Sequence, residues 1–132
     1  MFLDVLNKEE KDLFMDLAIK AAEANGEVAT EEIRMLHAFA SEMKISPRTE
    51  SAKELSEILK ELKEKSSKKS IKVITFELIG ILFADSEFDD AERNFLNTVT
   101  TTLGIENDIV KEMIAEINDY SAIFNRICKT VL

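Results

Sequence analysis

Apolar residues recur at intervals of three or four positions along most of the chain, which is the spacing of one face of an α-helix. The first such stretch predicts a helix from about Lys8 to Ala24. Asn7 and Glu10 stand three residues apart at its start, in the order of a capping box, and Asn25-Gly26 follows as a helix stop. The pattern therefore predicts an amphipathic helix with recognisable capping residues at both ends.

Two more amphipathic stretches follow. The first predicts a helix from about Thr30 to Lys44, and Ser46-Pro47 predicts the start of a third helix, because Ser caps and Pro favours the first helical position. A polar segment from Lys65 to Ser70 then interrupts the pattern and indicates a connection between two halves. The residues expected to face inward are Ile33, Leu36, Ala40 and Met43 in the second helix and Ala52, Leu55, Leu59 and Leu62 in the third.

The segment from Ile71 to Ala84 is apolar on nearly all sides. Its periodicity alone fits a buried helix or a buried strand, and its length favours a helix. A helix without a polar face needs neighbours on several sides, so we expect this one to be the central and most buried helix.

The last third of the chain predicts three more helices. Asp89 and Glu92 form a second capping-box pattern before a helix that ends at Gly104, and Asn107 to Ile117 and Ser121 to Val131 follow as separate helices. About seven helices with short connections predict an all-α bundle. In the helix before Gly104 the residues expected to face inward are Phe95, Leu96, Val99 and Leu103.

Composition narrows the class of protein. A chain of 132 residues fits a single domain, 1–132, and 3 Gly with 1 Pro are too few turn residues for a β-sandwich or barrel. A net charge of −9 argues against nucleic-acid binding and against an anionic lipid surface. No apolar stretch reaches the roughly 20 residues of a membrane span, so direct membrane insertion is not expected. Cys128, the single cysteine, indicates a reducing, cytoplasmic location and is expected to pack among apolar neighbours.

An internal repeat emerges when the chain is compared with itself at an offset of 60 residues. The alignment predicts a duplicated helix-loop-helix unit, with pseudo-repeats over about 8–64 and 68–131 and two loops related by an approximate two-fold axis. The matched positions are 24–28 with 84–88, Glu32 with Glu92, Leu36 with Leu96 and Ile45 with Ile105.

Around these two loops the sequence resembles the TerB-like family, a helical domain associated with tellurite resistance. The family pattern is close to Ala-Asp-Gly-Glu-apolar-x-x-x-Glu, and residues 24–32 and 84–92 are similar to it. The first copy has Asn25 in place of Asp, and the second has Ser86 in place of Gly. The resemblance covers about Leu13 to Ile117 and implies an all-helical, non-enzymatic module linked to stress response and membrane-linked complexes.

The two loops also gather acidic side chains, which are the ligands that Ca²⁺ and Mg²⁺ prefer. They are a candidate site for a weakly bound divalent cation, although the twelfth residue counted from Asp85 is Leu96, which does not match an EF-hand. Helix capping is the ordinary role of acids near helix starts and is favoured over a cation site. The candidate ligands are Glu27, Glu32, Asp85, Glu87, Asp89 and Glu92.

No nucleophile or phosphate-binding glycine run accompanies these acids, so the sequence does not indicate catalysis. We expect a cytoplasmic, non-enzymatic, acidic scaffold that docks a partner protein, and the TerB-like resemblance implies a link to tellurite or another stress. The contact is expected on a loop face, because the helix faces are needed for the core. The alternative is a divalent-cation-binding domain or a small metal-dependent hydrolase that uses the acidic loops. His37 is expected to be a surface or hydrogen-bonded side chain, and the lysines between Lys60 and Lys72 are expected to be solvated.

Overall fold

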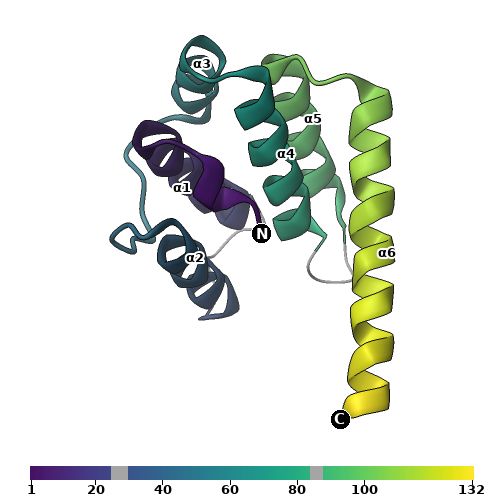
Figure 1. Cartoon of the computed structure of the whole chain (residues 1–132). Helices are drawn as coiled ribbons and strands as arrows, with labels where there is room; N and C mark the ends of the chain where they lie inside the picture. Colours follow the sequence, from purple (N-terminus) through teal and green to yellow (C-terminus); the bar gives the residue numbers. More distant parts are fainter. Residues whose placement is uncertain (25–29, 84–87) are drawn as a thin grey trace.

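The computed structural model describes residues 1–24, 30–83 and 88–132. In these residues the chain forms a short 3₁₀ helix, six α-helices and no strand (Figure 1), which confirms the predicted all-α class. The elements are η1 (Leu3–Val5), α1 (Lys8–Glu23), α2 (Thr30–Met43), α3 (Leu55–Lys65), α4 (Lys68–Leu82), α5 (Asp90–Leu103) and α6 (Asn107–Val131).

Two helices, α1 and α4, form the centre of the fold. α1 contacts α2, α3 and α4, whereas α4 contacts α1, α5, α6 and η1. The prediction of a central helix over Ile71–Ala84 is confirmed for α4, but the expectation that it is the most buried one is wrong. α1 has ten buried residues against seven in α4, and its fully buried side chains include Phe14, Met15, Leu17, Ala18 and Ile19.

Both predicted capping boxes are present. The Asn7 side chain accepts a hydrogen bond from the Glu10 N–H at 2.9 Å, and the Glu10 carboxylate accepts one from the Asn7 N–H at 3.0 Å. Asp89 and Glu92 make the same pair of bonds at 2.8 and 3.4 Å. These bonds satisfy backbone donors that a helix start leaves without partners, and so they fix where α1 and α5 begin.

The element bounds follow the offset of 60 residues. α1 and α4 begin at residues 8 and 68, and α2 and α5 cover 30–43 and 90–103. Both α2 and α5 are followed by a left-handed residue, Lys44 with φ 58° and Gly104 with φ 76°. The next N–H, of Ile45 or Ile105, then donates to a carbonyl five residues back at 3.0 Å, which is a Schellman closure. α3 and α6 begin at 55 and 107 and do not share the offset.

The third predicted helix begins later than Ser46-Pro47 suggests. α3 starts only at Leu55, and Ala52, which was expected to face inward, is exposed. The preceding connection is held along α1 by Arg48, whose guanidinium donates to the Asp16 carboxylate and to the Asp12 carbonyl. These long-range bonds override the local signal for a helix start.

The last two predicted helices are a single helix. α6 runs from Asn107 to Val131 because residues 118–120 contain no Gly or Pro to stop it. Two smaller expectations also change. The predicted connection over Lys65–Ser70 shortens to Ser66 and Ser67, and Ile33, which was expected to face inward, is 37% exposed.

Candidate interaction surface

The acidic residues singled out in the sequence do not form a metal site in the described part of the chain. Asp89 and Glu92 are joined in the cap of α5, and Glu92 is only 3% exposed. Glu32 lies in the first turn of α2, where an acid complements the helix dipole. Glu27, Asp85 and Glu87 lie outside the described residues. Over 1–24, 30–83 and 88–132, no group of three or more His, Cys, Asp or Glu side chains is arranged to hold a metal ion.

The histidine and the lysine cluster that the sequence places on the surface are indeed exposed. His37 is exposed on α2. The lysines around the junction of α3 and α4 are solvated charges, and Lys65 lies 3.8 Å from Glu9. The exposed members of the cluster are Lys60, Lys63, Lys65, Lys68, Lys69 and Lys72.

The most unusual surface is on α6, whose first half packs on the body of the protein and whose second half does not. Met113 is buried and Ile117 packs against the core, whereas no side chain from Asn118 to Leu132 is buried. Figure 1 shows this end of α6 extending past the other helices. The expectation that helix faces are consumed by the core is therefore wrong for α6. Cys128, which was expected to be packed, is partly exposed there.

A single apolar stripe runs along the whole of α6. Its members follow one another at alternating intervals of three and four residues, which keeps them on one face of the helix. The face that buries Met113 therefore continues beyond the body as an exposed surface. The stripe consists of Val110, Met113, Ile117, Tyr120, Phe124, Ile127 and Val131.

A cleft of about 600 Å³ lies between η1, α4 and α6, beside the point where α6 leaves the body. Phe2 and Phe76 meet edge to face in its wall, with ring centroids 5.8 Å apart. Gly80 leaves room on the α4 side, since a Cβ added there would meet nothing within 4 Å. The lining residues are Met1, Phe2, Phe76, Glu77, Gly80, Glu116, Ile117, Tyr120 and Ser121.

Glu77 and Glu42 hold η1 at the edge of this cleft. The Phe2 N–H donates to Glu77 at 2.6 Å, and the Leu3 N–H donates to Glu42 at 3.0 Å. The Met1 ammonium lies 2.9 Å from Glu77 and 3.1 Å from Glu42. Burial of the ammonium opposes its charge, but hydrogen bonds and attraction from the two carboxylates outweigh burial and raise the pKa of the Met1 amine. These contacts fix Phe2 against Phe76.

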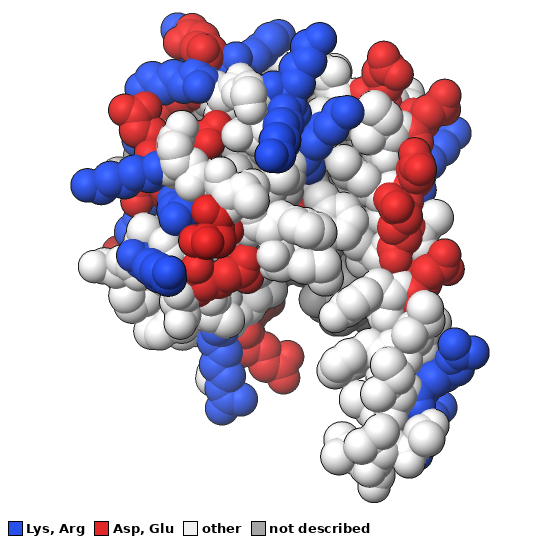
Figure 2. All heavy atoms as spheres, viewed as in Figure 1, with Lys and Arg blue, Asp and Glu red and all other residues white. Residues whose placement is uncertain are grey.

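Charge divides α6 into two parts. Its first half carries exposed acids, which Figure 2 shows as a red column beside the body, and the second half is mostly uncharged with basic groups on its outer side. In the second half, from Tyr120 onward, the only charged side chains are Arg126 and Lys129. The exposed acids of the first half are Asp108, Glu112, Glu116 and Asp119.

Comparison with protein-family models, with curated proteins and with solved structures found no significant match. The TerB-like resemblance therefore stays a prediction from the two loop motifs. In the described residues, no helix combines the length and the apolar character needed to cross a membrane.

Proposed function

We propose that the protein is a non-enzymatic interaction module whose cleft between η1, α4 and α6 receives an apolar, basic segment of a partner protein. The observation that supports this function most directly is the cleft itself, lined by aromatic rings and left open at Gly80. Concave apolar surfaces with a few polar groups at the edge are the ordinary form of binding sites. Phe2, Phe76 and Tyr120 offer the ring surface on which apolar side chains pack.

The acidic side chains near the cleft and the net charge of the chain favour a positively charged partner segment. Glu116 lies in the cleft lining, Asp119 follows one turn later on α6, and the whole chain carries −9. A negative field of this size attracts cationic segments and repels anionic ones, and it raises the association rate most at low salt. A partner segment with Lys or Arg beside its apolar residues fits both properties of the cleft.

The setting of this interaction is also part of the proposal. The single cysteine supports a reducing, cytoplasmic location. The TerB-like resemblance supports a link to tellurite or another stress. Among the described residues no observation favours the alternative of a cation-binding domain or metal-dependent hydrolase, because Asp89 and Glu92 serve the cap of α5.

The test is a capture experiment from native cells with two matched variants. Gly80→Lys places a cationic side chain in the cleft, and it should leave the fold intact because Gly80 is helical with open space around it. Asn97→Lys makes the same change of charge at an exposed position of α5 outside the cleft. The partner should be retained by the wild type and by Asn97→Lys and lost with Gly80→Lys.

Two results would contradict the proposal. One is that no specific partner is recovered at physiological salt. The other is that Gly80→Lys retains the partner as well as the Asn97→Lys control does, which would place the contact elsewhere. Circular dichroism and a thermal melt of both variants show whether the fold is preserved.

A further inference from the structure

The second half of α6 exposes apolar side chains that no other part of the described chain covers. Tyr120, Phe124 and Ile127 are 53–56% exposed, and Val131 is 72% exposed. With Ile123 they present about 500 Å² of apolar surface, at the upper end of the largest patches found on monomers. This is more than half of the roughly 800 Å² that each partner contributes to a stable interface.

The spacing of the apolar residues in the stripe favours a second copy of the same helix as the partner. Tyr120, Phe124, Ile127 and Val131 follow one another at intervals of four, three and four residues, which read the same in both directions. Two copies of this helix placed antiparallel, with a two-fold axis between residues 125 and 126, therefore bring the apolar positions into register. Tyr120 of each copy then meets Val131 of the other, and Phe124 meets Ile127, as in the seam of a coiled coil.

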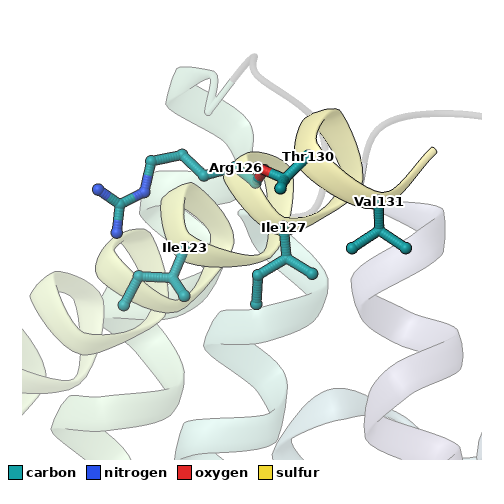
Figure 3. A pocket seen from close by; sticks show the side chains of 5 residues that line it. All are labelled: Ile123, Arg126, Ile127, Thr130 and Val131. Atoms are coloured by element: carbon teal, nitrogen blue, oxygen red, sulfur yellow. The ribbon is translucent and has the colours of Figure 1, made fainter.

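Charge favours the same arrangement. All 26 acidic residues lie before Tyr120, so two copies of this acidic protein meet at the second half of α6 without opposing acids. Ile123, Ile127 and Val131 point to one side of α6 and Arg126 points away from them (Figure 3). Antiparallel pairing brings the basic end of each helix toward the acidic first half of the other, whereas parallel pairing would place both basic ends together.

We propose that the protein forms a homodimer through antiparallel pairing of the second halves of two α6 helices. Phe124 and Ile127 form the two central layers, and Tyr120 and Val131 form the outer ones. The two central layers lie beyond the body of the protein, and Tyr120 is the one side chain of the seam that also lines the cleft proposed for the partner segment.

The first test is the mass of the protein in solution, measured by sedimentation over a range of concentrations. The wild type should approach twice the 15.0 kDa of one chain. Phe124→Glu combined with Ile127→Glu should give a monomer that still unfolds cooperatively, because neither side chain belongs to the core, and its melting temperature should no longer depend on protein concentration. Ala122→Glu combined with Asn125→Glu adds the same charge on the outer side of α6 and should remain dimeric.

The second test fixes the direction of pairing by disulfide trapping in a Cys128→Ser background. A mixture of Tyr120→Cys and Val131→Cys chains should cross-link, since cysteine Cα atoms must approach within about 7 Å. Neither variant alone should cross-link. In the antiparallel pair, position 120 of one copy is displaced by 11 residues, or about 16 Å along the helix, from position 120 of the other, and the same holds for position 131. Cross-linking of Tyr120→Cys with itself would overturn the antiparallel arrangement.

Other outcomes overturn the dimer itself. One is a wild-type protein that stays monomeric at its highest soluble concentration. Another is a dimer that persists in the variant Phe124→Glu with Ile127→Glu. A third is a monomer that binds phosphatidylcholine vesicles through the apolar stripe, as shown by co-flotation. Failure of the dimer leaves the proposed function intact, because that function is tested separately by Gly80→Lys.

Discussion

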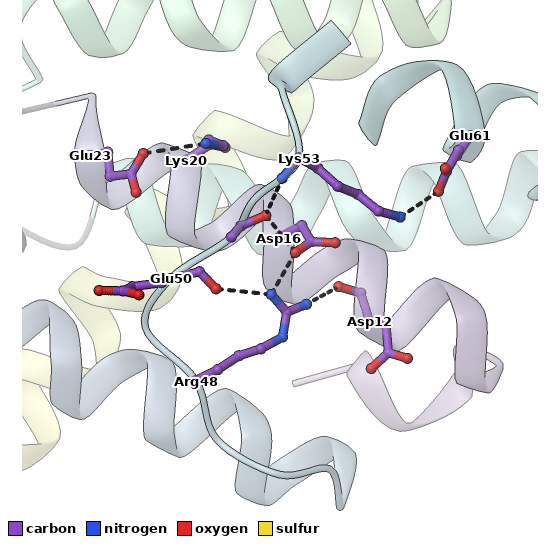
Figure 4. Close-up of polar contacts among 9 residues, drawn as sticks. Asp12, Asp16, Lys20, Glu23, Arg48, Glu50, Lys53 and Glu61 are labelled. Atoms are coloured by element: carbon purple, nitrogen blue, oxygen red, sulfur yellow. Dashed lines mark hydrogen bonds and ion pairs between the residues drawn. The ribbon is translucent and has the colours of Figure 1, made fainter. Parts of the chain in front are cut away.

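Arg48, in the connection between α2 and α3, donates a hydrogen bond from Nη1 to Oδ1 of Asp16 in the middle of α1 at 2.6 Å (Figure 4). The Asp16 side chain is nearly buried and also accepts a hydrogen bond from the Ser51 hydroxyl at 2.7 Å. Arg48 in turn donates to the carbonyls of Asp12 and Glu50. One carboxylate therefore fastens a connection without regular structure to the centre of the fold.

Replacing Asp16 should destabilise the protein. Asp16→Ala leaves Arg48 and Ser51 without their shared acceptor, and we expect the free energy of unfolding to fall by about 2–3 kcal/mol. Glu23→Ala removes an exposed partner of Lys20, 3.6 Å away, and should change it by no more than about 0.5 kcal/mol. Urea unfolding of both variants measures the difference. Equal effects would show that Asp16 has no special role.

The two described glycines should respond to alanine in opposite ways. Gly80 lies inside α4, and an added Cβ meets nothing within 4 Å, so Gly80→Ala should stabilise by about 0.5–1 kcal/mol. Gly104 has φ +76°, a left-handed conformation that costs an alanine about 1–2 kcal/mol. Thermal melts of the two variants should therefore shift in opposite directions. A loss of stability with Gly80→Ala would mean that the α4 side of the cleft is tighter than described.

Variants of Asp89 can distinguish its role as the N-cap of α5 from a role as a metal ligand. Asn caps helices as well as Asp, so Asp89→Asn should keep the stability of the wild type, whereas Asp89→Ala should lose about 1 kcal/mol. If Asp89 acts only as a cap, added Mg²⁺ or Ca²⁺ at constant ionic strength should leave all three melting temperatures unchanged. A cation-dependent shift in the wild type that disappears in Asp85→Asn with Glu87→Gln would restore the cation site as a function of the loops.

Titration of Glu61 should report its ion pair with Lys53. The Lys53 ammonium donates to the Glu61 carboxylate at 2.8 Å, which lowers the pKa of Glu61 and raises that of Lys53. The contribution of Glu61 to stability is present above its ordinary pKa and is lost as pH falls through the lowered value. ¹³C NMR should show the Glu61 midpoint move upward in Lys53→Met. An unchanged midpoint would mean that the pair does not persist in solution.

Local signals in the sequence predicted local structure well. Asn7 with Glu10 and Asp89 with Glu92 mark helix starts because each cap involves residues only three positions apart. The non-helical connection before α3 could not be predicted in this way, because the partner of Arg48 is 32 residues away on α1. A pattern of neighbours along the chain contains no information about such a contact.

The candidate surface was harder to predict than the fold. The apolar stripe of α6 is visible as periodicity, and the absence of Gly or Pro at 118–120 could have indicated one long helix. Periodicity does not indicate which part of the stripe is buried, because burial depends on where α4 and η1 pack against α6. The cleft joins Phe2, Phe76 and Tyr120, which no spacing rule connects. The acidic loops remain a prediction at Glu27, Asp85 and Glu87.

From Tyr120 onward α6 is a helix with no buried side chain to support it. The packed first half of α6 supplies the helix nucleus, but each further residue gains little free energy from propagation alone, so the helix–coil equilibrium of this extension is marginal in water. Burying Phe124 and Ile127 against a second helix would supply the missing free energy, so ordering and association become one equilibrium. Amide hydrogens there would exchange rapidly in dilute protein and slowly in concentrated protein. The end of α6 would thus convert a change in protein concentration into a change in conformation.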